Sequence, residues 1–266
     1  MSAAAGVVRG HWHNLGVTVA LRVQLCGPLV IDRAGERLET RLPGRQGRLL
    51  LAYLALHRHR TVPRHELVAA LWPDAAPSNV DAGLSALLSK SRQVLGPDSL
   101  TGRSTVRFTA TAVRVDLEDA IESAHRAESA IAHQDWQRAW APSQIALFAA
   151  QRRFLDGEDG DEAHEWISDE RLRQVELRRR ALEAYGTACL GIGGAELAAA
   201  VRAGRTLVDV APFHETGTRL LMRALAAEGN PAEALRVYEA LRRSLREQLG
   251  VSPSAATRAV YAELNA

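Results

Sequence analysis

The spacing of apolar residues changes once along the chain, near residue 116. Before that point some segments alternate apolar and polar residues and others repeat apolar residues at helical spacing, whereas afterwards the spacing is helical almost throughout. The length of 266 residues is enough for two domains of ordinary size. The sequence therefore predicts a mainly α protein with a small β content, in which a mixed N-terminal domain precedes an all-α domain.

Residues 18–115 show the order of elements of a winged helix-turn-helix domain. Apolar alternation and short apolar runs predict strands at Val19–Leu25, Leu29–Ile31, Arg37–Thr40, Thr105–Thr109 and Ala112–Val115. Helical spacing predicts helices at Gly44–His57, at Arg64–Leu71 and from about Ser78 or Asn79, the candidate N-caps, to Leu95. The last two strands are expected to form a terminal hairpin, the wing.

Residues 116–266 are rich in alanine and leucine and are expected to form an all-α domain. Three stretches, which start at Asp135, Gly194 and Gly229, each join a polar or glycine-containing turn to an alanine-rich helix. The last two lie about 36 residues apart, close to the roughly 34 of a tetratricopeptide helical pair. A tetratricopeptide-like domain is therefore predicted, with an ordinary helical bundle as the alternative. Residues 1–17 are expected to be a flexible tail.

The formal net charge of +2 hides a strong division of charge along the chain. Residues 1–115 contain 15 basic and seven acidic side chains, whereas residues 116–266 contain 18 basic and 24 acidic ones. The first part therefore carries +8 and the second −6. Such asymmetry indicates a segment that meets a polyanion and a segment that does not. Chance variation between two domains is the alternative.

The sequence gives no sign of a membrane or secreted protein. No run approaches eighteen uncharged apolar residues, so we expect no membrane-spanning helix. The N-terminus lacks the apolar core of a signal peptide, and two cysteines are too few for a disulfide framework or a four-cysteine zinc site. We therefore expect a cytoplasmic protein.

The third predicted helix has the features of a DNA-reading helix. At 100° per residue, one face gathers Leu84, Leu88, Ser91 and Leu95, and the opposite face gathers Ala82, Ser85, Ala86, Ser89, Arg92 and Gln93. Small residues let a helix approach base edges closely, and serine, glutamine and arginine can hydrogen-bond to bases or phosphates. Lys90 lies to one side, where it suits a phosphate. A merely solvated helix face is the alternative.

Arginines outside this helix extend the predicted basic surface. Arg103 and Arg107 lie in and beside the loop after the third helix, where a wing would reach a minor groove or phosphates. Further positive charge comes from Arg45, Arg48, Arg58, Arg60 and Arg64. Phosphate contacts would supply much of the affinity and make it depend on salt. The predicted DNA-binding residues are Ser85, Ser89, Lys90, Arg92, Arg103, Arg107, Arg48 and Arg64.

Signals for catalysis or for a bound cofactor are weak. The chain has no Walker-type phosphate loop, and Gly191–Gly194 follows a helical segment instead of a strand, which favours a repeat turn. The pair His11 and His13 stands alone as a possible metal ligand set, and the acidic run Asp156–Glu162 is interpreted as a solvated loop. We expect no enzyme activity, no cofactor, no catalytic residues and no metal site.

Two sets of motifs resemble one family in its order and spacing. Leu71-Trp72-Pro73 and Ser89-Lys90-Ser91-Arg92 with Leu95-Gly96 resemble the OmpR-type winged helix of the Streptomyces antibiotic regulatory proteins. The segment from Gly229 to Leu264, with Leu249-Gly250-Val251-Ser252-Pro253, is similar to the bacterial transcriptional activation domain that follows it in that family. The resemblance covers roughly residues 19–266.

The resemblance implies a DNA-binding transcriptional activator. Members of the family bind direct repeats near the promoter −35 region, usually as dimers, and help to recruit RNA polymerase. Ser89, Lys90 and Arg92 match the family's Ser-Arg-x-Arg stretch, although Lys90 replaces an arginine and Ser91 replaces a leucine. The resemblance thus implies double-stranded DNA, RNA polymerase and a second copy of the chain as partners. The alternative is a helical protein-protein adaptor or a ligand-sensing regulator with a weakened DNA-binding domain.

Overall fold

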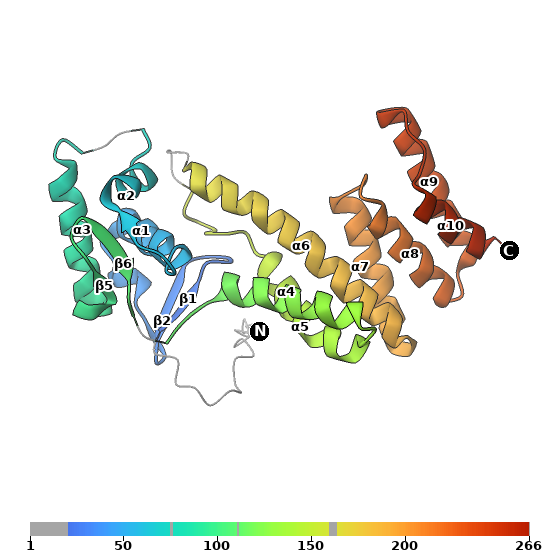
Figure 1. Cartoon of the computed structure of the whole chain (residues 1–266), viewed down its shortest axis with the longest axis horizontal. Coiled ribbons are helices and arrows are strands. Elements are labelled where there is room, and N and C mark those ends of the chain that lie inside the picture. Colours follow the sequence, from blue (N-terminus) through green and yellow to red (C-terminus); the bar gives the residue numbers. More distant parts are fainter. Residues whose placement is uncertain (1–20, 75–76, 111, 160–163, 266) are drawn as a thin grey trace, which may run out of the picture.

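The computed structural model of the chain describes residues 21–74, 77–110, 112–159 and 164–265. A mixed α/β part lies at one end of an elongated molecule, and a series of helices extends from it to the other end, where α9 and α10 lie (Figure 1). The predicted tail of residues 1–17 lies outside the described residues. No described helix is long and apolar enough to cross a membrane.

The N-terminal part contains short strands and three α-helices, as the apolar spacing predicted. Its strands are β1 Leu21–Gln24, β2 Val30–Arg33, β3 Glu36–Arg37, β4 Val62–Pro63, β5 Leu100–Thr101, β6 Thr105–Phe108 and β7 Val113–Val115. Its helices are η1 Glu39–Arg41, α1 Gly44–Leu56, α2 Arg64–Leu71, α3 Val80–Leu95 and η2 Pro97–Ser99. The order and the three helices confirm a winged helix-turn-helix.

Two small sheets hold these elements, and they correct the predicted terminal hairpin. The first sheet has the order β3-β2-β1-β7, with β7 parallel to β1, and the second has the order β4-β6-β5. The wing is therefore the hairpin β5–β6, and Val113 and Val115 leave it to pair with Leu21 and Val23. The physical reason is burial, because both valines pack into the core beside β1 and would be exposed on a free hairpin.

Helix α3 buries the face that its spacing predicted. Leu84, Leu88, Ser91 and Leu95 are each at most 2% exposed. The side chain of Asn79 accepts a hydrogen bond from the Ala82 N–H at 3.0 Å and caps the start of the helix. The hydroxyl of Ser91 has no hydrogen-bond partner among the described residues. A polar atom thus occupies a position that packing alone would give to an apolar side chain.

The C-terminal part is all α, as predicted. Its helices are α4 Asp116–Ala132, α5 Trp136–Ala150, α6 Glu165–Ile192, η3 Gly194–Glu196, α7 Leu197–Val210, α8 Glu215–Ala227, α9 Pro231–Leu249 and α10 Ala255–Leu264. The three repeated stretches lead into α5, α7 and α9, which are the first helices of the pairs α5–α6, α7–α8 and α9–α10. At Gly204, an added Cβ would lie 2.9 Å from the Cα of Leu221, so glycine lets α7 and α8 approach closely.

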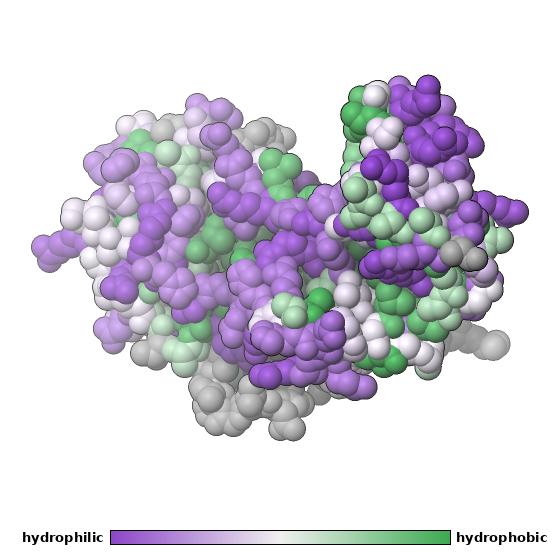
Figure 2. All heavy atoms as spheres, turned by 45° about the vertical axis from the view of Figure 1, so that its right-hand side comes forward, coloured by the Kyte–Doolittle hydropathy of each residue, from purple (hydrophilic) through white to green (hydrophobic). Residues whose placement is uncertain are grey.

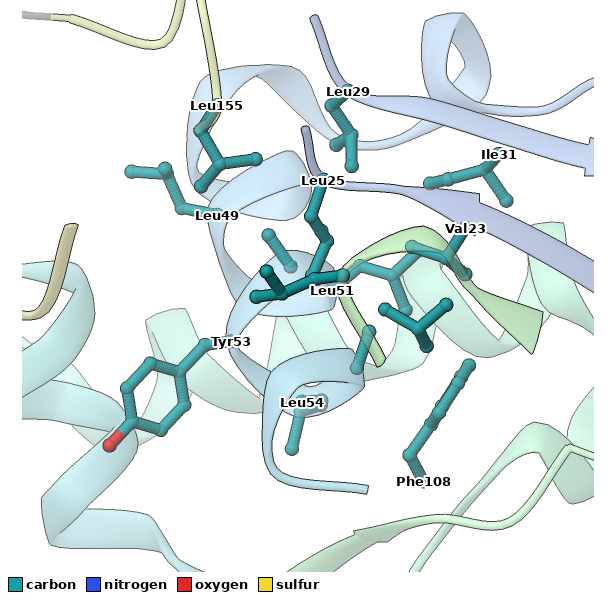
Figure 3. Close-up of a cluster of buried hydrophobic side chains, with 14 of the residues drawn as sticks. Val23, Leu25, Leu29, Ile31, Leu49, Leu51, Tyr53, Leu54, Phe108 and Leu155 are labelled. Atoms are coloured by element: carbon teal, nitrogen blue, oxygen red, sulfur yellow. The ribbon is translucent and has the colours of Figure 1, made fainter. Parts of the chain in front are cut away.

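The loop between α5 and α6 ties the two parts of the chain together. The Leu155 N–H donates to the Leu25 carbonyl at 2.8 Å, and the Gly27 N–H donates to the Arg153 carbonyl at 2.8 Å. Phe154 and Leu155 are fully buried, and Leu155 lies beside Leu25 and Leu49 (Figure 3). One hydrophobic cluster therefore runs from β1 through the winged helix into α4, α5 and α6.

Charged contacts also cross this boundary, and one of them corrects the interpretation of the acidic run as a solvated loop. Glu158, part of the acidic run predicted to be a solvated loop, is 7% exposed and pairs with Arg48, with 2.5 Å between Oε1 and Nε. Arg45 donates to the Glu158 carbonyl at 2.9 Å, and Arg58 pairs with Glu118 at the start of α4. Arginines of the basic half thus pair with acids of the acidic half. Near α2, Trp166 Nε1 donates to the Ala70 carbonyl at 3.0 Å.

Asp116 joins the start of α4 to the end of β1. Its carboxylate accepts hydrogen bonds from the Leu25 N–H at 2.7 Å and the Cys26 N–H at 3.1 Å. Burial nevertheless raises the pKa of Asp116 from its ordinary value of 3.8 to about 6, although these two N–H groups favour the charged form. The folded protein therefore binds a proton at this carboxyl more tightly than the unfolded chain does.

Phe154→Ala should lower the free energy of unfolding by about 3–5 kcal/mol, because it removes a fully buried ring from the shared cluster. Both parts should still unfold in one transition, because that cluster spans them. Denaturant unfolding followed by tryptophan fluorescence and by far-UV circular dichroism measures both. Phe148→Ala is the control, since Phe148 is 54% exposed and its loss should cost less than about 1 kcal/mol. Equal costs, or two separate transitions, would contradict this account.

Asp116→Asn should change how stability depends on pH. A carboxyl whose folded-state pKa is raised favours folding most when protonated, so its contribution falls as the pH rises from the ordinary 3.8 to about 6 and is constant above that. Replacing it with asparagine should remove this fall. Free energies of unfolding at pH 4, 5, 6 and 7 for both proteins test it, and a constant difference between the two across this range would contradict the raised pKa.

Candidate nucleic-acid interface

The predicted DNA-reading face of α3 is open to solvent. Ser85, Ser89 and Lys90 are exposed, together with Ala82, Ala86 and Gln93 on the same side of the helix. Helix α3 lies on the outer side of the N-terminal part, at the end of the molecule opposite α9 and α10 (Figure 1). Helix α3 therefore lies far from the C-terminal helices α9 and α10.

The wing lies next to α3 and carries two exposed arginines. Strand β6 alternates, with Val106 and Phe108 buried and Arg107 exposed, and Arg103 is exposed in the turn before it. Gly102 has a φ of +100°, and an added Cβ there would lie 2.0 Å from the Thr105 carbonyl oxygen. Only glycine fits this turn, so it sets the shape of the loop that presents Arg103.

Arg92 is turned toward the wing, although the sequence placed it on the open face. Its side chain is half-buried, Nε donates to the Leu100 carbonyl at 2.7 Å, and Nη2 donates to the Gly102 carbonyl at 3.4 Å. The guanidinium thus bridges the end of α3 to β5 and to the wing turn.

Arg64 connects α2, α3 and the wing. Its Nη2 donates to the Ser85 hydroxyl at 2.9 Å and to the Asp81 carbonyl at 3.1 Å, and its backbone N–H donates to the Ser104 carbonyl at 3.2 Å. The hydroxyl of Ser85 therefore already accepts one hydrogen bond. Arg64 remains at the edge of the α3 face, held against the first turn of that helix.

Arg48 lies apart from the other predicted residues. It projects from α1 toward the α5–α6 loop, where its guanidinium forms two hydrogen bonds with the carboxylate of Glu158. A phosphate contact by Arg48, as the sequence predicts, would compete with this pairing. Moving Arg48 to DNA would leave the nearly buried Glu158 carboxylate without its cationic partner.

Other arginines of the predicted basic cluster are also neutralised by acids. Arg60 is hydrogen-bonded to Glu66, and this contact holds the pKa of Glu66 down at about 2. Tyr53 Oη donates to Glu66 at 2.6 Å as well. Fewer basic side chains are therefore left for a polyanion than the charge of +8 indicates, and of those predicted to bind DNA, Lys90, Arg103 and Arg107 stay exposed. Counting charges along the sequence could not separate paired from available arginines.

The described residues hold no candidate metal centre. No group of three or more His, Cys, Asp and Glu side chains among them could hold a metal ion. The predicted pair His11 and His13 lies outside the described residues. Figure 2 shows a mainly hydrophilic face, with a hollow between the N-terminal part on the left and the C-terminal helices on the right.

Known proteins similar to this chain are transcriptional regulators. A sequence model of the bacterial transcriptional activator domain matches residues 115–265. Regulatory protein AfsR of Streptomyces coelicolor is 36% identical over 237 residues, which cover 88% of this chain but only 23% of AfsR. Transcriptional regulator RedD of the same organism is 28% identical, with 95% of this chain and 72% of RedD covered.

A solved structure shares the fold. Mycobacterium tuberculosis EmbR, in complex with a low-affinity phosphopeptide, superposes with a TM-score of 0.80 over 92% of this chain and 65% of the EmbR chain, at 22% identity. The similarity therefore extends over both the winged helix and the helices that follow it.

The family model covers more than half of the chain, and the relatives match in both parts. The winged helix-turn-helix followed by this activator domain therefore places the chain in the Streptomyces antibiotic regulatory protein family of transcriptional regulators.

Proposed function

We propose that this protein activates transcription by binding double-stranded DNA at promoters through α3 and the wing. The observation that carries the proposal is the juxtaposition of an exposed helix face, with Ser85, Ser89 and Lys90, and a hairpin that presents Arg103 and Arg107. A helix of this width enters the major groove, and a basic hairpin beside it reaches the flanking backbone or minor groove.

The side chains divide into two roles. Lys90, Arg103 and Arg107 carry positive charge at the ends of flexible stems and suit phosphate oxygens, which position a protein without reading sequence. Ser85, Ser89 and Gln93 can hydrogen-bond to base edges, and the methyl groups of Ala82 and Ala86 let the helix lie close to them. Specific recognition would thus come from a small-residue face, and affinity from the charged groups around it.

We further propose a division of labour within the chain. Residues 18–115 bind DNA, and residues 116–266 contact RNA polymerase and a second copy of the chain. The two copies together would recognise direct repeats near the −35 region. A regulator of promoters works where the chromosome lies, so the proposed location is the cytoplasm. Leu172 and Val175 on α6, which are 70% and 61% exposed, support a role of the helices in protein contacts.

An adaptor that has lost DNA binding is the competing function. The buried hydroxyl of Ser91 is the observation that favours it, because this atom has no hydrogen-bond partner within the described part of the chain and lies beneath the proposed reading face. A titration with DNA separates the two functions, since an adaptor would show no preference among sequences.

Lys90→Ala should weaken binding to DNA fragments selected from the upstream regions of the source genome. We expect the dissociation constant to rise about 5- to 20-fold, and the slope of log K against log salt to become shallower by about 0.9. Fluorescence anisotropy at four salt concentrations measures both quantities.

The matched control for this experiment is Arg223→Ala, which removes one exposed positive charge from α8. Its binding should equal that of the wild type. Equal binding of the wild-type protein to selected and to random DNA would contradict the proposed function and support the adaptor. If both variants lost the same affinity, the effect would be one of total charge and Lys90 would not lie in the interface.

A further inference from the structure

We propose that Arg92 is a positioning residue that holds the wing in place against the recognition helix, and that it does not itself contact DNA. The inference rests on the proposed DNA-binding function and adds to it. Arg92 stands beside Lys90 in the segment that resembles a DNA-reading motif, so the sequence alone favours a direct contact. The geometry of its guanidinium favours a different role.

The donors of Arg92 are directed at backbone carbonyls of the protein. Nε donates to Leu100 at 2.7 Å, which is a short and well-formed hydrogen bond, and Nη2 lies 3.4 Å from the Gly102 oxygen. The side chain is half-buried, whereas its neighbours Ser89, Lys90 and Gln93 are exposed. Swinging the whole guanidinium out to a phosphate would break its bond to the Leu100 carbonyl, whose own residue is 1% exposed.

The outer strand of the wing, β5, needs such a brace because few backbone bonds hold it. Strand β5 has only two residues, and it pairs with β6 at Leu100↔Phe108 and Thr101↔Arg107. Strand β6 is also paired with β4, at Val62↔Val106 and Pro63↔Thr105, whereas β5 is an edge strand that pairs with β6 alone among the described strands. The backbone N–H of Arg64 donates to the Ser104 carbonyl on the other side of the turn. Arg92 and Arg64 therefore hold the wing at two points.

The braced segment is the one that carries the exposed arginines. Arg107 is the register partner of Thr101, and Arg103 follows Gly102 directly. A shift of β5 and of Gly102 after it therefore moves both arginines relative to Lys90 on α3. The planar guanidinium can donate to two carbonyls at once from fixed positions, whereas a lysine ammonium is a single point charge on a flexible stem.

The first test does not involve DNA. Arg92→Ala should leave the overall unfolding transition in place but speed amide hydrogen exchange in residues 100–108, measured by mass spectrometry on the full chain. Exchange in α1 should stay as in the wild type. Unchanged exchange across the wing would overturn the proposal, whatever the protein does with DNA.

The second test asks whether Arg92 acts through the wing. Arg92→Ala is made in the wild type and in a variant that already carries Arg103→Ala and Arg107→Ala, and dissociation constants are measured on the same selected DNA. We expect Arg92→Ala to lower the affinity for DNA about tenfold or more in the wild-type background. In the background without Arg103 and Arg107 we expect it to lower the affinity less than about twofold. An equal loss in both backgrounds, with a salt slope that becomes shallower by about 0.9 in each, would show a direct phosphate contact and overturn the proposal.

Arg92→Lys is the second variant, and it keeps the charge and most of the stem. A phosphate contact would survive this change largely intact, whereas a brace across two carbonyls would not. We therefore expect Arg92→Lys to bind DNA as weakly as Arg92→Ala, and wild-type affinity in Arg92→Lys would count against the brace. Failure of the wild type to prefer any DNA sequence would instead overturn the proposed function and leave the exchange experiment to decide the role of Arg92.

Discussion

The insertion of the α5–α6 loop into the N-terminal core is the contact on which the rest of the structure depends. Phe154 and Leu155 leave no surface exposed, and their backbone pairs with Leu25 and Gly27 at the end of β1. Because burial of apolar side chains is the largest favourable term in folding, this insertion makes the winged helix and the first three C-terminal helices one cooperative body. The orientation of α3 and the wing is therefore set relative to α4, α5 and α6.

The boundary between the two parts also explains how much of the charge of the chain is paired. Arg48 and Arg58 of the basic half are paired with Glu158 and Glu118 of the acidic half, across the boundary between the two parts. Among the basic residues predicted to bind DNA, Lys90, Arg103 and Arg107 around α3 and the wing stay exposed. Charges of opposite sign in the two halves thus help to join them.

The local sequence pattern predicted most of the helices and strands, and its predictions were wrong where segments distant in the chain meet. The bounds of α2 and the buried side of α3 follow from local spacing and caps, which is why they could be read correctly. The terminal hairpin was wrong because β7 is drawn to β1, about ninety residues earlier in the chain, and no local signal reports that pairing. The role of Glu158 was missed for the same reason, since its partners lie 110 residues away.

The sequence by itself determined the winged helix, the helical pairs and the family, because these depend on periodicity and on motifs that stand close together in the chain. Only the tertiary structure decided which of the basic residues remain available to a ligand. Lys90, Arg103 and Arg107 face solvent, whereas Arg48 is paired with Glu158 and Arg92 is hydrogen-bonded to the wing. A sequence shows where the arginines are, but it does not show which acceptor each of them meets. That partner depends on which acceptor the fold brings within hydrogen-bonding distance.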